Sequence, residues 1–192
     1  MRIPLFPLQT VVFPEGLLPL RIFEARYLDM VSRCLREDGG FGICQIRSGS
    51  EVGAAAEIYD VGTYVRIVDW SQSQDGLLAI TVKGEKKFRV LSSTVESDQL
   101  RTAEVEWLPE EQEAALPEEF RTLAELLERI VSQLGEAYPG PAPRFDLAGF
   151  VGARLTEILP LKAALKQELL EQDDPLVRLF ALRDALHNLD LA

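Results

Sequence analysis

The sequence has few of the side chains that build most metal and catalytic sites. Its 192 residues include one histidine, His187, and two cysteines, Cys34 and Cys44. A zinc site needs three or four converging histidine, cysteine or carboxylate ligands, so no metal site is predicted. Two cysteines do not make a disulfide framework either, and we expect both to be buried free thiols.

Nucleotide-binding motifs are also missing. No segment fits the phosphate-binding loop GxxxxGK[ST], and none fits the dinucleotide fingerprint GxGxxG. His187 lies on a predicted amphipathic helix near the C-terminus, where we expect it on the polar face and not in a catalytic triad. We therefore predict no catalytic residues, no cofactor and no enzymatic activity.

A long uninterrupted apolar run is absent as well. The stretch RIPLFPLQTVVFPEGLLPLRIFEARY, residues 2–27, is strongly apolar, but prolines interrupt it at Pro4, Pro7, Pro14 and Pro19. Prolines break the apolar helix that a signal peptide requires, and a membrane-spanning helix needs about 20 consecutive apolar residues. We expect a soluble, cytoplasmic protein without membrane association.

Acidic residues outnumber basic residues, 31 to 20. The formal net charge is −11, which argues against a general nucleic-acid-binding protein, since such proteins neutralise phosphates with lysine and arginine. Residues 1–108 carry 12 basic and 15 acidic side chains, whereas residues 109–192 carry 8 and 16. This asymmetry indicates two different halves.

The first half has the pattern of short strands and one early helix. Alternating or β-branched segments between glycine and proline turns predict seven or eight strands. The apolar positions after Glu24 repeat at helical spacing and predict one inserted helix. The predicted strands are IPLFPL, at an edge, then VVF, LLPLRI, FGICQI, VGTYVRIVDW, LLAITV, KKFRVLSSTV and LRTAEVEW. Asp75-Gly76 predicts a hairpin and Gly84 a further turn, so we expect a small, mostly antiparallel closed or half-closed barrel.

The second half is predicted to be helical. An acidic connector, 109–116, precedes Pro117, which with two glutamates marks a helix start. Four short to medium amphipathic helices follow, and the last begins after Asp174, a predicted N-cap, with Pro175 in its first position. The predicted domains are 1–108, a β-barrel subdomain, and 117–192, an α-helical bundle.

One basic cluster stands out in KGEKKFR. On a strand, Lys87 and Arg89 share one face and Phe88 lies on the other. Either the cluster is the charged outer face of a strand, or it contacts RNA or a nucleotide. The candidate nucleic-acid-binding residues are Lys83, Lys86, Lys87 and Arg89.

The opening residues resemble a known family. PLFPLQTVVFPEGLLPLRIFEARYLDMV is similar to the start of the N-terminal, substrate-binding domain of Lon proteases, which also occurs alone in bacterial proteins and within cereblon-type proteins. VGTYVRIVDW, ITVKGEKKFRV and LKAALKQELLEQDDPLVRLFALRDAL continue the resemblance over nearly the whole chain. Lys87 stands where the family usually has arginine.

The resemblance implies an α+β fold, a PUA-like mostly antiparallel β-barrel with one inserted helix, followed by a C-terminal helical bundle. It implies a non-catalytic module that binds exposed apolar or unfolded polypeptide segments. The motor and protease domains of Lon are not in this sequence, so we expect no ATPase and no peptidase activity. Unfolded or misfolded polypeptides are the expected partners, and whether a protease acts in trans as a further partner is left open. RNA or nucleotide binding through the barrel is the alternative.

Polypeptide binding requires an accessible apolar groove with a polar rim. The candidate residues lie where the opening strands meet the first helix. They are Phe13, Leu18, Phe23, Arg26 and Tyr27. The alternative for each residue is that its side chain packs in the core.

Overall fold

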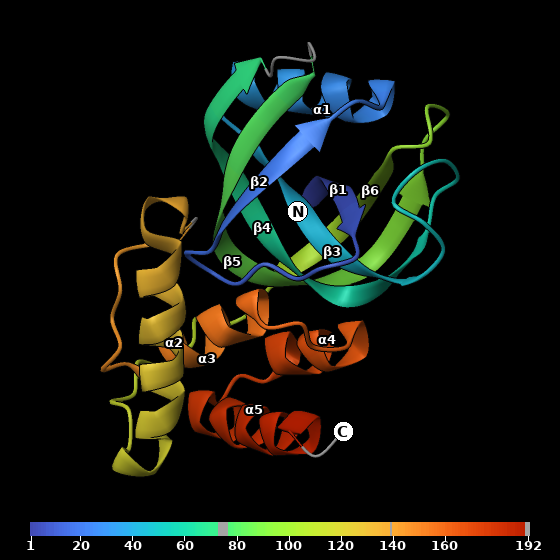
Figure 1. Cartoon of the computed structure of the whole chain (residues 1–192). Coiled ribbons are helices and arrows are strands. Elements are labelled where there is room, and N and C mark those ends of the chain that lie inside the picture. Colours follow the sequence, from blue (N-terminus) through green and yellow to red (C-terminus); the bar gives the residue numbers. More distant parts are fainter. Residues whose placement is uncertain (73–76, 139, 191–192) are drawn as a thin grey trace. The chain divides into compact units, whose positions relative to one another are not determined.

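A computed structural model of the protein describes residues 1–72, 77–138 and 140–190. The chain divides into two units, Met1–Pro109 and Glu110–Ala192. Strands make up most of the first unit and helices most of the second (Figure 1). No helix in the described ranges is both long and apolar enough to cross a membrane. The predicted hairpin at Asp75-Gly76 lies outside the described residues.

The first unit combines one sheet with one helix. The sheet order is β2-β5-β4-β3-β1-β6, and β5 also pairs with β6. Every pairing is antiparallel except that of β1 with β3. The elements are β1 (Arg2–Leu8), β2 (Leu17–Ile22), α1 (Ala25–Arg36), β3 (Gly40–Ser48), β4 (Glu57–Gln72), β5 (Leu78–Val95) and β6 (Arg101–Trp107). The predicted α+β class and inserted helix are confirmed.

The predicted turn at Gly84 is wrong, because β5 runs through it as one strand. Gly84 instead receives the loop before β2. Its N–H donates to the carbonyl of Gly16, and its own carbonyl accepts from the N–H of Glu15, both at 2.8 Å. A Cβ atom at this position would lie 2.1 Å from the carbonyl oxygen of Phe13. The glycine is needed for close backbone approach and not for a turn.

Two other strand predictions are also corrected. VVF, residues 11–13, is a buried loop and not a strand. β1 is not at an edge, since it pairs with β6 over residues 2–5 and with β3 over residues 5–8. Pro4 therefore lies in the half registered only with β6, and Pro7 in the half registered only with β3. Each proline has one side without a strand partner, which accounts for its place inside the sheet.

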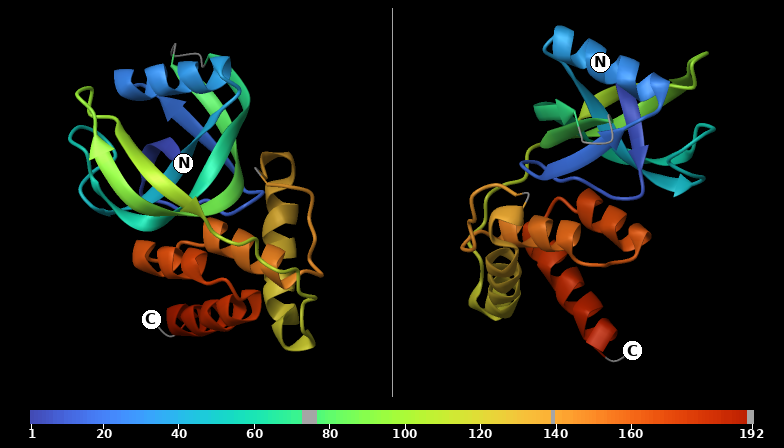
Figure 2. Two further views of the ribbon diagram at one scale, coloured as in Figure 1. Left: turned by 180° about the vertical axis from the view of Figure 1, so that it is seen from behind. Right: turned by 45° about the horizontal axis from the view of Figure 1, so that its top comes forward.

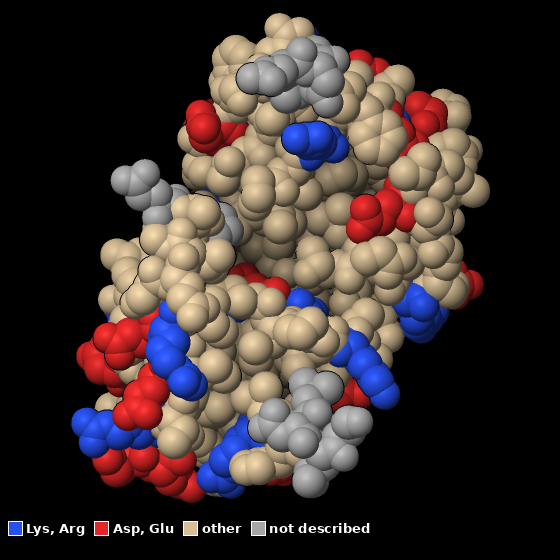
Figure 3. Space-filling model, in the orientation of Figure 1, with Lys and Arg blue, Asp and Glu red and all other residues tan. Residues whose placement is uncertain are grey.

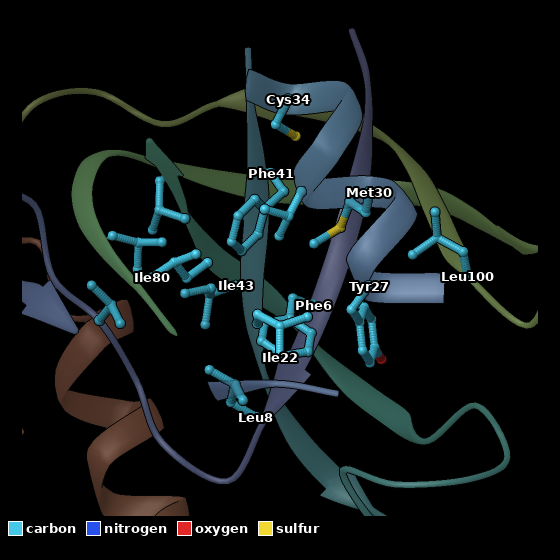
Figure 4. Close-up of a cluster of buried hydrophobic side chains, with 14 residues drawn as sticks. Phe6, Leu8, Ile22, Tyr27, Met30, Cys34, Phe41, Ile43, Ile80 and Leu100 are labelled. Atoms are coloured by element: carbon cyan, nitrogen blue, oxygen red, sulfur yellow. The ribbon is translucent and has the colours of Figure 1, made fainter. Parts of the chain in front are cut away.

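Two buried clusters hold the first unit together. One joins α1 to the sheet, with Tyr27, Met30 and Cys34 pointing from the helix toward Phe6 and Phe41 on the strands (Figure 4). In both views of Figure 2, α1 lies across one end of the strands. The other cluster fills the opposite face of β1 and β3. Its buried members are Ile3, Leu5, Cys44, Ile58, Phe88, Ala103 and Val105.

The second unit is built from helices around a third cluster. Phe120, Leu127, Val151, Leu155 and Leu179 are among its most buried members. Asp174 caps the last helix as predicted, because its carboxylate accepts the Leu176 N–H at 2.8 Å. The elements are a 3₁₀ turn (Glu118–Phe120), α2 (Arg121–Leu134), a 3₁₀ turn (Gly135–Ala137), α3 (Ala148–Ile158), α4 (Ala163–Glu171) and α5 (Pro175–Asp190).

Candidate functional site

A hollow of about 410 Å³ opens on the first unit where three strands lie side by side. Each strand contributes three consecutive residues, and the register aligns them across the sheet, with Leu20 and Trp70 both opposite Ile80. The lining residues are Pro19, Leu20 and Arg21 of β2, Asp69, Trp70 and Ser71 of β4, and Ala79, Ile80 and Thr81 of β5. These residues, with Phe23, are called the β2 surface below.

A β-bulge presents the largest side chain of the β2 surface. The β4–β5 register shifts between Ile67 and Asp69, so Val68 is the extra residue. A bulge re-aims the side chains that follow it. Here the indole of Trp70 is 61 % exposed and Val68 is 53 % exposed. Exposed apolar side chains this large, beside a hollow, are typical of a binding surface.

Phe23 extends this surface beyond the end of β2. Phe23 directly follows the end of β2, two residues after Arg21, which lines the hollow. Its side chain is 55 % exposed. Figure 3 views the molecule from the side of β2 and shows that uncharged side chains cover most of this face of the first unit. Phe23 thus has the exposure that a binding role requires.

Leu18 differs from Phe23, because it packs against the cluster that joins α1 to the sheet. Phe13 and Tyr27 are almost fully buried. Tyr27 makes an edge-on contact with Phe6 at 4.2 Å between ring centroids, and burial raises the pKa of its phenol. In this conformation Phe13 and Tyr27 are parts of the core and offer no surface to a partner.

Arg26 is buried as well and joins two segments of the first unit. Its guanidinium pairs with the carboxylate of Glu24 and donates to the carbonyl of Gln99, each at 2.9 Å. It also lies 4.7 Å from the centre of the Tyr27 ring. The FEARY segment therefore fixes the start of α1 against the loop before β6. This part of the opening motif is structural.

The outer edge of β2 shapes how a polypeptide could bind. β2 pairs with β5, and the described strands include no second partner for it. An open edge normally accepts another strand, but Pro19, in the middle of β2, has no N–H to donate to one. An added strand would therefore lack a hydrogen bond at Pro19, and the surface offers mainly side chains for contact.

The basic cluster does not form one continuous basic face. Lys87 is buried, and Lys86 lies opposite Tyr64 on β4. The Arg89 guanidinium lies 3.9 Å from the carboxylate of Glu106. Lys83 is exposed on β5. RNA or nucleotide binding through these residues stays a prediction.

Neither cysteine has the environment of a nucleophilic thiol. Cys34 and Cys44 are free and buried, as predicted, and burial raises the pKa of both. Ordinary nucleophilic cysteines have lowered pKa values and partial exposure. His187 is exposed, with one ring nitrogen 2.9 Å from the carbonyl of Arg183. Among the described residues, no group of three histidine, cysteine or acidic side chains could hold a metal ion.

Trp70 was not among the predicted site residues, although the sequence holds a signal for it. In VRIVDW, Ile67 and Val68 are adjacent apolar residues, which interrupts the alternation that a regular strand requires. Such an interruption indicates a bulge. The predicted peptide-binding residues all lie between Phe13 and Tyr27, before β4 in the chain.

Comparison with known proteins agrees with this architecture. The family model described as the ATP-dependent protease La (LON) substrate-binding domain matches residues 2–188. The chain belongs to this family. It is similar to the Lon N-terminal domain protein from Xanthomonas campestris, at 38 % identity and a TM-score of 0.77, covering 96 % of this chain and 98 % of that one.

The N-terminal domain of the Mycobacterium avium complex Lon protease has the same fold, with a TM-score of 0.60 at 22 % identity and coverage of 96 % and 97 %. The Lon protease of Trichlorobacter lovleyi is 30 % identical over 96 % of this chain but only 23 % of its own length. That of Desulfovibrio desulfuricans is 27 % identical over 96 % of the chain and 22 % of its own length. The chain thus spans less than a quarter of these Lon proteases and matches their substrate-binding part.

Proposed function

We propose that the protein is a non-catalytic module that binds exposed apolar segments of unfolded or misfolded polypeptides on the β2 surface. The observation that carries this proposal is the hollow between β2, β5 and β4, with Trp70 61 % exposed at its side. Membership in the LON substrate-binding family supports the same role. The first unit would form the PUA-like barrel, residues 1–108, and the helical subdomain 117–192 would follow it.

The chemistry of the surface fits an apolar side chain held within a polar rim. Pro19 and Trp70 supply exposed apolar area, and Leu20 beside them is partly buried against the core. Arg21 and Asp69 supply one charge of each sign at the border. Transfer of apolar area from water contributes about 25 cal/mol per Å². One large apolar side chain in the hollow therefore gives weak binding, and several such segments in one unfolded chain raise it only by a statistical factor.

A titration tests the proposal directly. A labelled, permanently unfolded polypeptide is added to the purified protein, and binding is followed by fluorescence anisotropy. We expect saturation in the micromolar range and a weakening of about tenfold in Trp70→Ala, which is typical of a buried aromatic anchor. Absence of saturable binding at high micromolar concentration would contradict the proposal.

Leu91→Ala is a matched control for Trp70→Ala. Leu91 lies on β5 outside the hollow and is 62 % exposed, so both substitutions remove an equally exposed apolar side chain. We expect the control to bind as the unaltered protein does. If Leu91→Ala weakens binding as much as Trp70→Ala, the site is not the β2 surface.

We further propose that bound polypeptides can be passed to a protease acting in trans and that the protein works in the cytoplasm. Addition of a full-length Lon protease to the polypeptide-loaded protein tests the first of these. Faster degradation than with the protease alone supports an adaptor role, and slower degradation indicates that the protein only sequesters its clients.

A further inference from the structure

A partly buried ion pair ties the acidic segment 111–116 to the helices of the second unit. The guanidinium of Arg178, on α5, is 1 % exposed and donates to the carboxylate of Glu111. The same guanidinium donates to two backbone carbonyls near the end of α4, those of Leu169 at 2.9 Å and Gln172 at 2.5 Å. One side chain thus joins three segments.

The surface of α3 is shaped to receive this pair. A Cβ atom at Gly149 would lie 2.3 Å from a carboxylate oxygen of Glu111, and one at Gly152 would lie 3.1 Å from the Arg178 side chain. Both contacts are tighter than ordinary van der Waals distances. The two glycines leave room for Glu111 and Arg178 to lie against the helix.

Backbone contacts continue the attachment along the segment. The carbonyl of Ala114 accepts the N–H of Ala148 at 2.9 Å, and the N–H of Leu116 donates to the carbonyl of Asp146 at 2.7 Å. Ala148 is the first residue of α3, and its N-cap, Leu147, makes no side-chain cap. The segment therefore caps α3, since the first N–H groups of a helix have no partners within it.

We infer that residues 111–116 are a strap locked to the helical unit by Glu111 and Arg178, and not a loose linker. On the N-terminal side of the strap, the N–H of Leu108 donates to the carbonyl of Lys87 at 3.0 Å, within the first unit. Only Pro109 and Glu110 therefore lie between this hydrogen bond and the strap. If the Glu111–Arg178 pair is broken, the linker extends from Pro109 to Pro117, where the first helical turn begins.

Amide hydrogen exchange of the full chain tests the strap. In Arg178→Met, the amides of Leu116 and Ala148 should exchange at least about tenfold faster, because their bonds depend on a segment that is no longer held. The amide of Leu127, inside α2, should keep its protection. Methionine fills part of the buried space, and the Glu111 carboxylate that loses its partner is 23 % exposed and can be hydrated, so the variant is expected to fold.

Glu111→Gln and the double variant Glu111→Gln/Arg178→Met complete the test. If the pair acts as one lock, the double variant exchanges no faster than Arg178→Met alone, because the second substitution removes nothing further. Glu113→Gln is the control, since Glu113 is exposed and lies 3.4 Å from Arg144. Unchanged exchange at Leu116 and Ala148 in Arg178→Met overturns the inference, as does an equal rise at Leu127.

Discussion

The guanidinium of Arg26 donates a hydrogen bond to the backbone carbonyl of Gln99, 73 residues away in the chain. Gln99 has a positive φ of 68°, in a turn that leads into β6. The bond connects the start of α1 to this turn from within the buried part of the first unit. An arginine inside the opening motif therefore holds together segments that lie far apart in sequence.

Replacement of this arginine should destabilise the first unit. Arg26→Met removes the bond to Gln99 and the ion pair with Glu24, and hydrogen bonds to charged groups contribute about 1.5–3 kcal/mol each at most. We expect the free energy of unfolding in urea to fall by about 2–3 kcal/mol. Arg47→Met, which removes an exposed pair with Glu57 at 3.8 Å, should change it by less than about 0.5 kcal/mol. Equal losses in the two variants would refute the bracing role.

Gly84→Ala should damage the contact between β5 and the loop before β2. The added methyl group meets the carbonyl oxygen of Phe13, which belongs to the backbone and cannot rotate away. We expect a loss of about 2–3 kcal/mol in the free energy of unfolding, the range of overpacked cores. At Gly39 an added Cβ has no atom within 4 Å, so Gly39→Ala should be close to neutral. Thermal unfolding of both variants checks this, and a neutral Gly84→Ala would contradict the tight contact.

Burial of Cys44 should make stability depend on pH in the alkaline range. Its ordinary pKa is 9.0, and burial raises it strongly in the folded protein. Well below pH 9 the thiol is protonated in both states and contributes no pH dependence. Above pH 9 the unfolded chain loses the proton first, so the free energy of unfolding falls as pH rises toward the folded pKa.

Urea unfolding of the protein and of Cys44→Ala between pH 8 and pH 10 measures this effect. The alanine variant starts from lower stability, because it leaves a small cavity, but should lose less on going to the higher pH. An identical slope in both proteins would contradict the raised pKa. In the folded protein at pH 8, we also expect both thiols to resist alkylation.

Several features of the fold follow from local sequence. Alternation predicts β4, helical spacing predicts α1, and Asp174 with Pro175 predicts the start of α5. Each of these signals concerns residues close together in the chain. The Lon-like opening motif also predicts the family, because the spacing of its prolines, phenylalanines, glycine and FEARY segment is specific.

Other features depend on contacts that local sequence does not encode. Gly84 resembles a turn residue, but the reason for it is a loop that arrives from residues 13–16. Pro4 and Pro7 suggest an edge strand, but β1 changes its partner strand midway along its length. Among the predicted site residues, Phe23 is exposed whereas Phe13 and Tyr27 are buried, and apolar character alone does not separate these cases. The exposure of each candidate therefore had to come from the structure.

The two tryptophans of the chain, Trp70 and Trp107, allow the most direct test of binding on the β2 surface. Trp70 beside the hollow is 61 % exposed, whereas Trp107 lies at the end of β6, in edge-on contact with Tyr64. Trp107→Phe leaves Trp70 as the single reporter, and Trp70→Phe leaves Trp107. Each variant is titrated with an unfolded polypeptide that contains no tryptophan.

The measurement is tryptophan emission and its quenching by acrylamide. Binding in the hollow should shift the emission of Trp70 to shorter wavelength and protect it from the quencher, while Trp107 should remain as in the free protein. A shift of Trp107 with Trp70 unchanged would contradict the assignment of polypeptide binding to the β2 surface.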